Sequence, residues 1–281
     1  MEENSILKIN QMKKIVFFLL CAASMANAQK KGSFSLHFDN FVGAEPLALK
    51  TARYTNAAGN EFSVSLFQYY ISNISLIKKD GSIYTLPQDQ SYFLIRENNE
   101  ATKTITLTDI PKGKYKGISF TIGIDSARSA SDISQRKGCL DVAGEARDMY
   151  WAWNSGYIFV KMEGTSPQST GKNNIFMYHI GLFGGIGDKK TLNNIKQTTL
   201  SFGGEELRIK GGATPMAIFI KADALKLMNG PNNVDMAKNA TVMGGPYSAT
   251  IANNYQTMFS FGGLKPVPVA VADQSVTTGT K

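Results

Sequence analysis

The sequence predicts a mainly β protein, built as a single antiparallel β-sandwich with a few short helices. Short segments rich in aromatic and β-branched residues recur along the chain and are separated by turn-forming residues. One of these segments alternates cleanly between apolar and polar side chains, as a half-buried strand does. Helical patterns are confined to two short stretches. Repeated short strands with few helices are typical of a sandwich.

The first predicted strand covers residues 33–41. One face carries Phe34, Leu36 and Phe38, and the other carries Ser35, His37 and Asp39. A second strand, residues 62–78, is followed by the hairpin turn Lys79-Asp80-Gly81-Ser82 and a return strand at 83–86. Short strands are then expected at 92–96 and 103–107, before the turn at 111–114.

The second half of the chain continues the pattern. A strand at 115–124 is followed by an aperiodic loop, residues 125–146, and an aromatic block begins shortly after this loop. Further strands are predicted at 157–162, 175–182, 198–202, 206–210 and 216–221. Residues 222–228 and 247–259 are the helical candidates, and Asn229-Gly230-Pro231 ends the first of them.

The aromatic block, residues 149–157, contains Trp151 and Trp153, the two tryptophans of the sequence. Side chains at positions i and i+2 of a strand share one face, so the pair forms a single indole surface if the segment is extended. Two interpretations remain open here. The block is either a core cluster, since Trp buries a large apolar area, or part of a ligand site.

Residues 1–28 are predicted to be a secretory signal peptide. Lys13-Lys14 precedes an apolar run, and Ala26-Asn27-Ala28 is an A-x-A cleavage pattern. Residues 1–11 precede Met12 and are interpreted as an upstream extension of the start site. The folded domain is expected at 30–264, and a flexible tail at 265–281, where few residues can be buried. The product is therefore expected to be exported, in the periplasm or cell envelope.

Charge and cysteine content exclude several function classes. The net charge is +8, but the cations are scattered without a basic helix or basic–aromatic array, so no nucleic-acid site is predicted. After cleavage no apolar stretch approaches the roughly 20 residues of a membrane span. Cys139 is then the remaining cysteine, which excludes an intrachain disulfide, and we expect it to be buried and inert.

His37 and His179, the two histidines, are the candidate metal ligands. Two imidazoles from distant strands can meet across a sandwich, and imidazole suits copper, zinc or nickel. A third ligand is then needed, for which a Met, Asp39, Cys139, water or a group derived from Trp are candidates. The alternative is that His37 is an exposed strand residue and His179 a hydrogen-bonded core residue.

Acid–base catalysis has weaker support in the sequence. Asp125, Asp148 and Glu163 surround the aromatic block, and a pair of them could serve a hydrolase, although no spacing selects one. No nucleophile elbow or paired Cys/His signature is present. The protein is therefore predicted not to be an enzyme.

Five blocks of the sequence, spread over residues 33 to 262, resemble the MbnP-like family of exported copper-binding proteins. They are residues 68–76 with Asp80-Gly81, residues 110–115 with 122–125, residues 149–164, residues 176–181 with His179-Ile180-Gly181, and residues 251–259. The block M-x-W-x-W-x-S-G-Y at 149–157 is the most specific of them.

The resemblance implies a secreted β-rich domain that holds copper through His side chains and is found beside a di-haem cytochrome c peroxidase-like partner. It further implies that this partner oxidises a Trp to kynurenine, whose aromatic amine can approach the metal. On this sequence His37 and His179 would be the ligands, and Trp151 or Trp153 the modified or metal-adjacent residue. The alternative function is a metal-free envelope module that binds a protein partner or a glycan.

Overall fold

Two sheets and a short hairpin make up the protein, for which a computed structural model describes residues 31–153, 156–211 and 215–267. The strands of the smaller sheet are β1 (Lys31–Val42), β2 (Glu45–Pro46), β7 (Thr104–Pro111), β16 (Met216–Asp223) and β18 (Phe259–Pro266). Those of the larger sheet are β3 (Tyr54–Thr55), β4 (Glu61–Lys78), β5 (Ile83–Thr85), β6 (Tyr92–Arg96), β8 (Gly113–Ile122), β9 (Tyr150–Trp151), β10 (Gly156–Thr165), β11 (Ile175–Gly181), β14 (Lys196–Ser201), β15 (Leu207–Ile209) and β17 (Thr241–Met243). The hairpin consists of β12 (Phe183–Ile186) and β13 (Lys189–Asn193).

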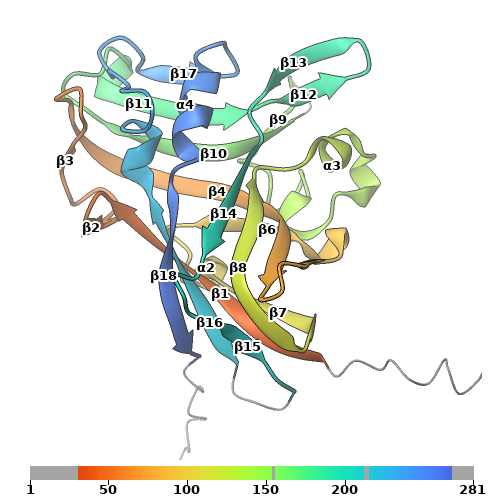
Figure 1. Ribbon diagram of the computed structural model, residues 1–281. Helices are drawn as coiled ribbons and strands as arrows, with labels where there is room; N and C mark the ends of the chain where they lie inside the picture. Colours follow the sequence, from red (N-terminus) through yellow and green to blue (C-terminus); the bar gives the residue numbers. More distant parts are fainter. Residues whose placement is uncertain (1–30, 154–155, 212–214, 268–281) are drawn as a thin grey trace, which may run out of the picture.

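The sheets are curled and pack face to face around a shared core (Figure 1). The five-stranded sheet has the order β18–β16–β1–β2, with β7 also pairing with β1. The eleven-stranded sheet has the order β14–β8–β4–β10–β11–β17, and the shorter strands pair with β4, β8 and β10. The β12–β13 hairpin projects away from the body at one end (Figure 1). The prediction of a mainly β fold is confirmed.

The helices are short, as expected. They are α2 (Glu100–Lys103), α3 (Ser126–Ala130) and α4 (Ser248–Tyr255). The predicted helix at 247–259 corresponds to α4, whereas the one at 222–228 is a single 3₁₀ turn at Ala224–Leu227. Within the described residues, no helix combines the length and apolar character needed to cross a membrane.

Local sequence patterns determine the strands as predicted. In β1 the side chains of Phe34, Leu36 and Phe38 are completely buried, whereas His37 lies on the opposite face. The β4–β5 turn is closed by Asp80, whose carboxylate accepts a hydrogen bond from the Ser82 backbone N–H at 2.8 Å. An Asx-type turn of this kind follows from the short side chain of Asp.

The strand pairing departs from the purely antiparallel arrangement that we predicted. β1 pairs with β16 in parallel, from Phe34 with Met216 to Phe41 with Asp223, and β11 pairs with β17 in parallel. Both pairings join strands separated by long stretches of chain, so no tight turn dictates their direction. The periodicity of a strand reports which face is buried but not the direction of its neighbour.

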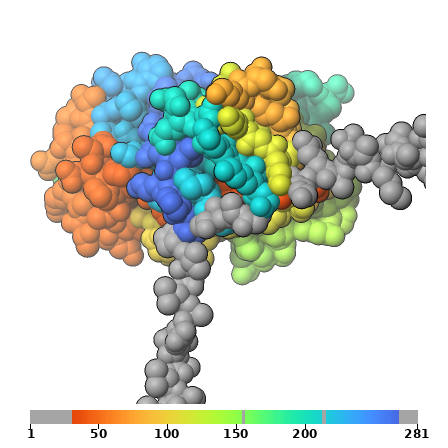
Figure 2. Space-filling view, turned by 60° about the horizontal axis from the view of Figure 1, so that its bottom comes forward, coloured from red at the N-terminus to blue at the C-terminus, as the bar shows by residue number. Residues whose placement is uncertain are grey.

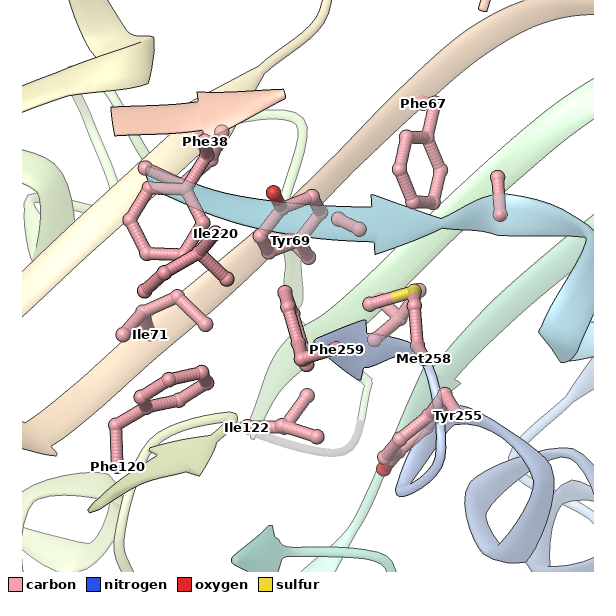
Figure 3. Packing of buried hydrophobic residues seen from close by; sticks show 14 of the residues in the cluster. Phe38, Phe67, Tyr69, Ile71, Phe120, Ile122, Ile220, Tyr255, Met258 and Phe259 are labelled. Carbon is pink, nitrogen blue, oxygen red and sulfur yellow. The ribbon is translucent and has the colours of Figure 1, made fainter. Parts of the chain in front are cut away.

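Phe259 lies at the centre of the core, between the two sheets (Figure 3). Its ring centroid is 6.3 Å from that of Phe38, 5.4 Å from that of Tyr69 and 5.1 Å from that of Phe120, all edge to face. Each such pair stabilises the fold by roughly 0.5–1.5 kcal/mol beyond the contribution from burying its apolar surface. The core thus joins the first, middle and last thirds of the chain.

The last strand extends beyond the predicted end of the domain. β18 pairs with β16 through Lys265 and Pro266, so these two residues belong to the sheet and not to the predicted tail at 265–281. β18 (blue) and the cyan segment beside it form one continuous surface in Figure 2. The remainder of that tail, residues 268–281, and the predicted signal peptide, 1–28, lie outside the described residues.

Candidate functional site

A row of five side chains crosses the outer face of the larger sheet on five neighbouring strands. In register these are Arg96 on β6, Gln68 on β4, Lys161 on β10, His179 on β11 and Met243 on β17. The other faces of these strands are apolar and turned to the core. Strand register therefore collects residues that are far apart in the sequence into one polar strip.

Asp148 anchors one end of this strip from the loop that precedes β9. Its carboxylate accepts hydrogen bonds from both Arg96 amino groups, at 2.9 and 2.7 Å, and from Gln68 Nε2 at 2.7 Å. The Arg96 guanidinium lowers the pKa of Asp148 to about 2, and the Gln68 amide contributes in the same direction. Lys161 Nζ donates to the Asp148 carbonyl at 3.0 Å. These contacts fix the chain immediately before the aromatic block.

His179 is held at the centre of the strip by Glu163. The His179 Nε2 atom lies 2.7 Å from Glu163 Oε1, and the imidazole side chain is 11% exposed. The hydrogen bond from His179 and the charge of Lys161, 3.6 Å away, lower the pKa of Glu163. An ionised carboxylate only accepts hydrogen bonds, so Nε2 carries the proton and Nδ1 carries the lone pair. Among the described residues no hydrogen bond engages Nδ1.

The Trp pair lies on the same face, next to His179 along β11. Gly181 stands two residues beyond His179, and a Cβ at this glycine would come within 2.8 Å of the Trp151 ring. The Trp151 and Trp153 ring centroids are 5.2 Å apart, but Trp153 lies in the turn after β9, so the two indoles stack on each other and do not share one strand face as we predicted. Trp151 is 6% exposed and Trp153 is 69% exposed. The Trp153 ring also rests against Gly244, where a Cβ would lie 3.1 Å from its edge.

His37 is not part of this site. It projects from the outer face of β1 in the smaller sheet, and its neighbour Phe38 fills the shared core from the inner face. His179 likewise projects outward from the larger sheet, so the structure does not bring the two imidazoles together, contrary to the prediction. The alternation that buries the Phe side chains of β1 is the physical reason.

Both ring nitrogens of His37 already have partners. Nδ1 lies 2.8 Å from the Thr104 hydroxyl, and Nε2 lies 3.1 Å from Asp39 Oδ1. If the Asp39 carboxylate accepts from Nε2–H, the lone pair on Nδ1 is used by the Thr104 hydroxyl. His37 could therefore bind a metal only after losing one of these bonds, whereas His179 could bind with its Glu163 contact intact.

The other candidates from the sequence have structural partners. Asp125 caps α3 by accepting from the Arg128 N–H at 2.9 Å, and it accepts from the Tyr92 hydroxyl at 2.6 Å. The Tyr92 and Arg128 bonds lower the pKa of Asp125. Cys139 donates to the Tyr92 carbonyl at 3.3 Å, and burial raises its pKa to about 12. The thiol is partly rather than fully buried, and it stays protonated at neutral pH.

Sequence reasoning missed the side chains that position the site. Arg96, Gln68 and Met243 belong to strands whose mutual register is not visible in the sequence, and Gly181 and Gly244 matter because they leave room for the indoles. The sequence did predict the strand at 175–182 that carries His179, which corresponds to β11.

Comparison with known proteins gives one family. No curated protein matches the chain. Among solved structures it is similar to MbnP from Methylosinus trichosporium, with 14% sequence identity, a TM-score of 0.48, and coverage of 77% of this chain and 82% of that one. A sequence model described as MbnP matches residues 31–244, and the chain therefore belongs to the MbnP family.

Proposed function

We propose that this chain is an exported, non-enzymatic copper-binding protein whose site is built on His179 beside the Trp pair. The observation that carries the proposal is the placement of His179. Glu163 holds the imidazole with one nitrogen available, on the face where Trp151 packs over Gly181. A carboxylate behind a ligand histidine fixes its tautomer and raises its basicity, as in many metal sites. The MbnP family membership supports the choice of metal.

The donor set around His179 suits copper better than a hard cation. The described residues contain no group of three or more His, Cys, Asp or Glu side chains that could hold a metal ion. Glu163 is engaged by His179 and Lys161, and Asp148 by Arg96. An imidazole and soft or aromatic neighbours therefore remain, which favours copper by ligand type. Copper bound here would be held by His179, and His37 would play no part.

Trp153 is the residue that we expect an exported di-haem peroxidase-like partner to oxidise. Its indole is 69% exposed, so a partner can reach it, whereas Trp151 beneath it is shielded. Conversion to kynurenine would cleave the indole C2–C3 bond with peroxide as the oxidant used by the partner, and hydrolysis would then release C2 as formate. The donor-only N–H would thereby become an aromatic amine with a lone pair. The amine would then add a ligand beside His179.

Copper titration of the mature protein, purified from a host that exports it with its leader, tests the proposal. We expect His179→Ala to lose copper and His37→Ala to retain it, because only His179 has a nitrogen free of hydrogen bonds among the described residues. Intact mass would report the amino terminus after leader cleavage, a kynurenine and the bound metal. Wild-type binding no tighter than that of His179→Ala would overturn the copper role.

A metal-free interaction module is the second candidate, and one observation favours it. Trp153 lines a hollow of about 600 Å³ at the β12–β13 hairpin, together with Phe183, Gly185, Ile186, Asp188, Lys189 and Thr191. An exposed indole beside polar side chains can stack on a sugar or a peptide. Glycan-array binding that disappears in Trp153→Ala, together with no copper binding, would support this alternative.

A further inference from the structure

Met243 is an exposed methionine directly beside His179. β17 pairs in parallel with β11, and Met243 is the partner of His179 in that register. The preceding pair, Tyr178 with Val242, is buried at 0% and 5% exposure, so the next residue on each strand turns to the outer face. Met243 is 38% exposed there. Its side chain and the imidazole are therefore nearest neighbours across two strands.

Packing of the core does not account for this methionine. Met149, Met162, Met228, Met236 and Met258 are all buried at 0–1% exposure, where a flexible thioether fills gaps in the core. Met243 lies on the outside of the sheet and belongs to neither hydrophobic core cluster of the described residues. A thioether is, however, a soft ligand that selects cuprous copper.

The charges and rings around Met243 also favour a monovalent ion. Lys161 is the partner of His179 on the opposite flank, on β10, and its side chain is only 12% exposed. A cation of lower charge is repelled less by this ammonium group. On the other side the Trp153 ring rests against Gly244, the residue after Met243, and an indole attracts a nearby cation through its ring face.

We propose that the Met243 thioether and His179 Nδ1 together hold Cu(I), so that the site selects cuprous over cupric copper. This inference rests on the proposed copper-binding function and adds to it a second ligand and an oxidation state. Glu163 stays bonded to His179 Nε2 and binds no metal. Met243 thereby links β17 to the copper site.

Met243→Leu is the decisive variant because it keeps an apolar side chain of similar volume and removes the thioether. Met216→Leu, on β16 of the other sheet and partly buried against the core, is the control for removal of a thioether away from the site. Affinities for Cu(I), Cu(II) and the redox-inert probe Ag(I) are measured by competition with chelators of known affinity. The ε-methyl resonances of ¹³C-labelled methionine report sulfur coordination directly, without depending on affinity.

We expect Met243→Leu to weaken Cu(I) and Ag(I) binding at least tenfold with little effect on Cu(II), and Met216→Leu to match the wild type. One methionine methyl resonance should shift on Ag(I) addition and be missing in Met243→Leu. If wild-type copper binding depends on His179 but Met243→Leu leaves Cu(I) affinity and the methyl shift unchanged, the inference is overturned and the proposed function stands. If the wild type binds no better than His179→Ala, the proposed function itself is overturned.

Discussion

Asp148→Asn is the perturbation that tests how the aromatic block is held in place. The Asp148 carboxylate accepts two hydrogen bonds from Arg96 and one from Gln68, and it precedes Trp151 by only three residues. The side chain of Asn has one carbonyl oxygen in place of two carboxylate oxygens, and its NH₂ group would face the N–H donors of Arg96 or Gln68. We therefore expect the variant to destabilise the protein and to loosen the Trp pair above the sheet.

The size of the effect follows from the pKa of Asp148, which falls from its ordinary value of 3.8 to about 2. Each pKa unit corresponds to about 1.4 kcal/mol, so the carboxylate contributes at most about 2.5 kcal/mol to the free energy of unfolding. The side chain is 44% exposed, and solvent screening reduces such a contribution to roughly 1 kcal/mol. Because the folded pKa is depressed, this stability is fully present above about pH 4 and is lost as the pH falls toward 2.

Urea unfolding followed by Trp fluorescence measures this difference at several pH values. Wild type should exceed Asp148→Asn by roughly 1 kcal/mol at pH 7, and the gap should close near pH 2. Asp188→Asn, in the exposed turn of the β12–β13 hairpin, is the control and should match the wild type. Equal stability of Asp148→Asn and wild type at pH 7, or a gap that survives acidification, would refute the argument.

Three further predictions concern the indoles and the thiol. Iodide should quench Trp151→Phe strongly and Trp153→Phe weakly, since the remaining indole is exposed in the first and shielded in the second; equal quenching would contradict the stacking order. Gly181→Ala should lower the free energy of unfolding by about 1–3 kcal/mol, because its Cβ would lie 2.3 Å from the Tyr157 carbonyl oxygen and 2.8 Å from the Trp151 ring; an unchanged melting temperature would count against this close packing. At pH 8, Cys139 should react with a thiol reagent far more slowly in the folded protein than in urea, because burial raises its pKa to about 12; equal rates would disprove this.

The strands were predictable from sequence because their determinants are local. The alternation of residues 33–41 reports the buried face of β1, and Asp80-Gly81 specifies a turn whatever surrounds it. The direction of β16 beside β1 was not predictable, because most of the chain lies between the two strands. The extension of β18 to Pro266 has the same origin, since its pairing with β16 adds residues that have no apolar signal of their own.

The candidate site was only half predictable for a related reason. The sequence pointed to His179 and to the Trp pair, and the fold does place them side by side on one face. It also predicted that His37 would join them, but a residue on the outward face of one sheet cannot reach the outward face of the other through a filled core. Once β1 buries its three Phe and Leu side chains, the position of His37 is already decided.

Besides their positions, the hydrogen bonds of the two histidines decide which of them can act as a metal ligand. Each has a carboxylate at Nε2, Asp39 for His37 and Glu163 for His179, so both are held in a defined tautomer. The difference lies at Nδ1, where His37 meets the Thr104 hydroxyl and His179 meets no hydrogen-bonding partner among the described residues. If Thr104→Val were introduced, His37 would gain a free nitrogen too. Copper binding in that variant with His179→Ala, and none in His179→Ala alone, would show that the hydroxyl is what keeps His37 from acting as a ligand.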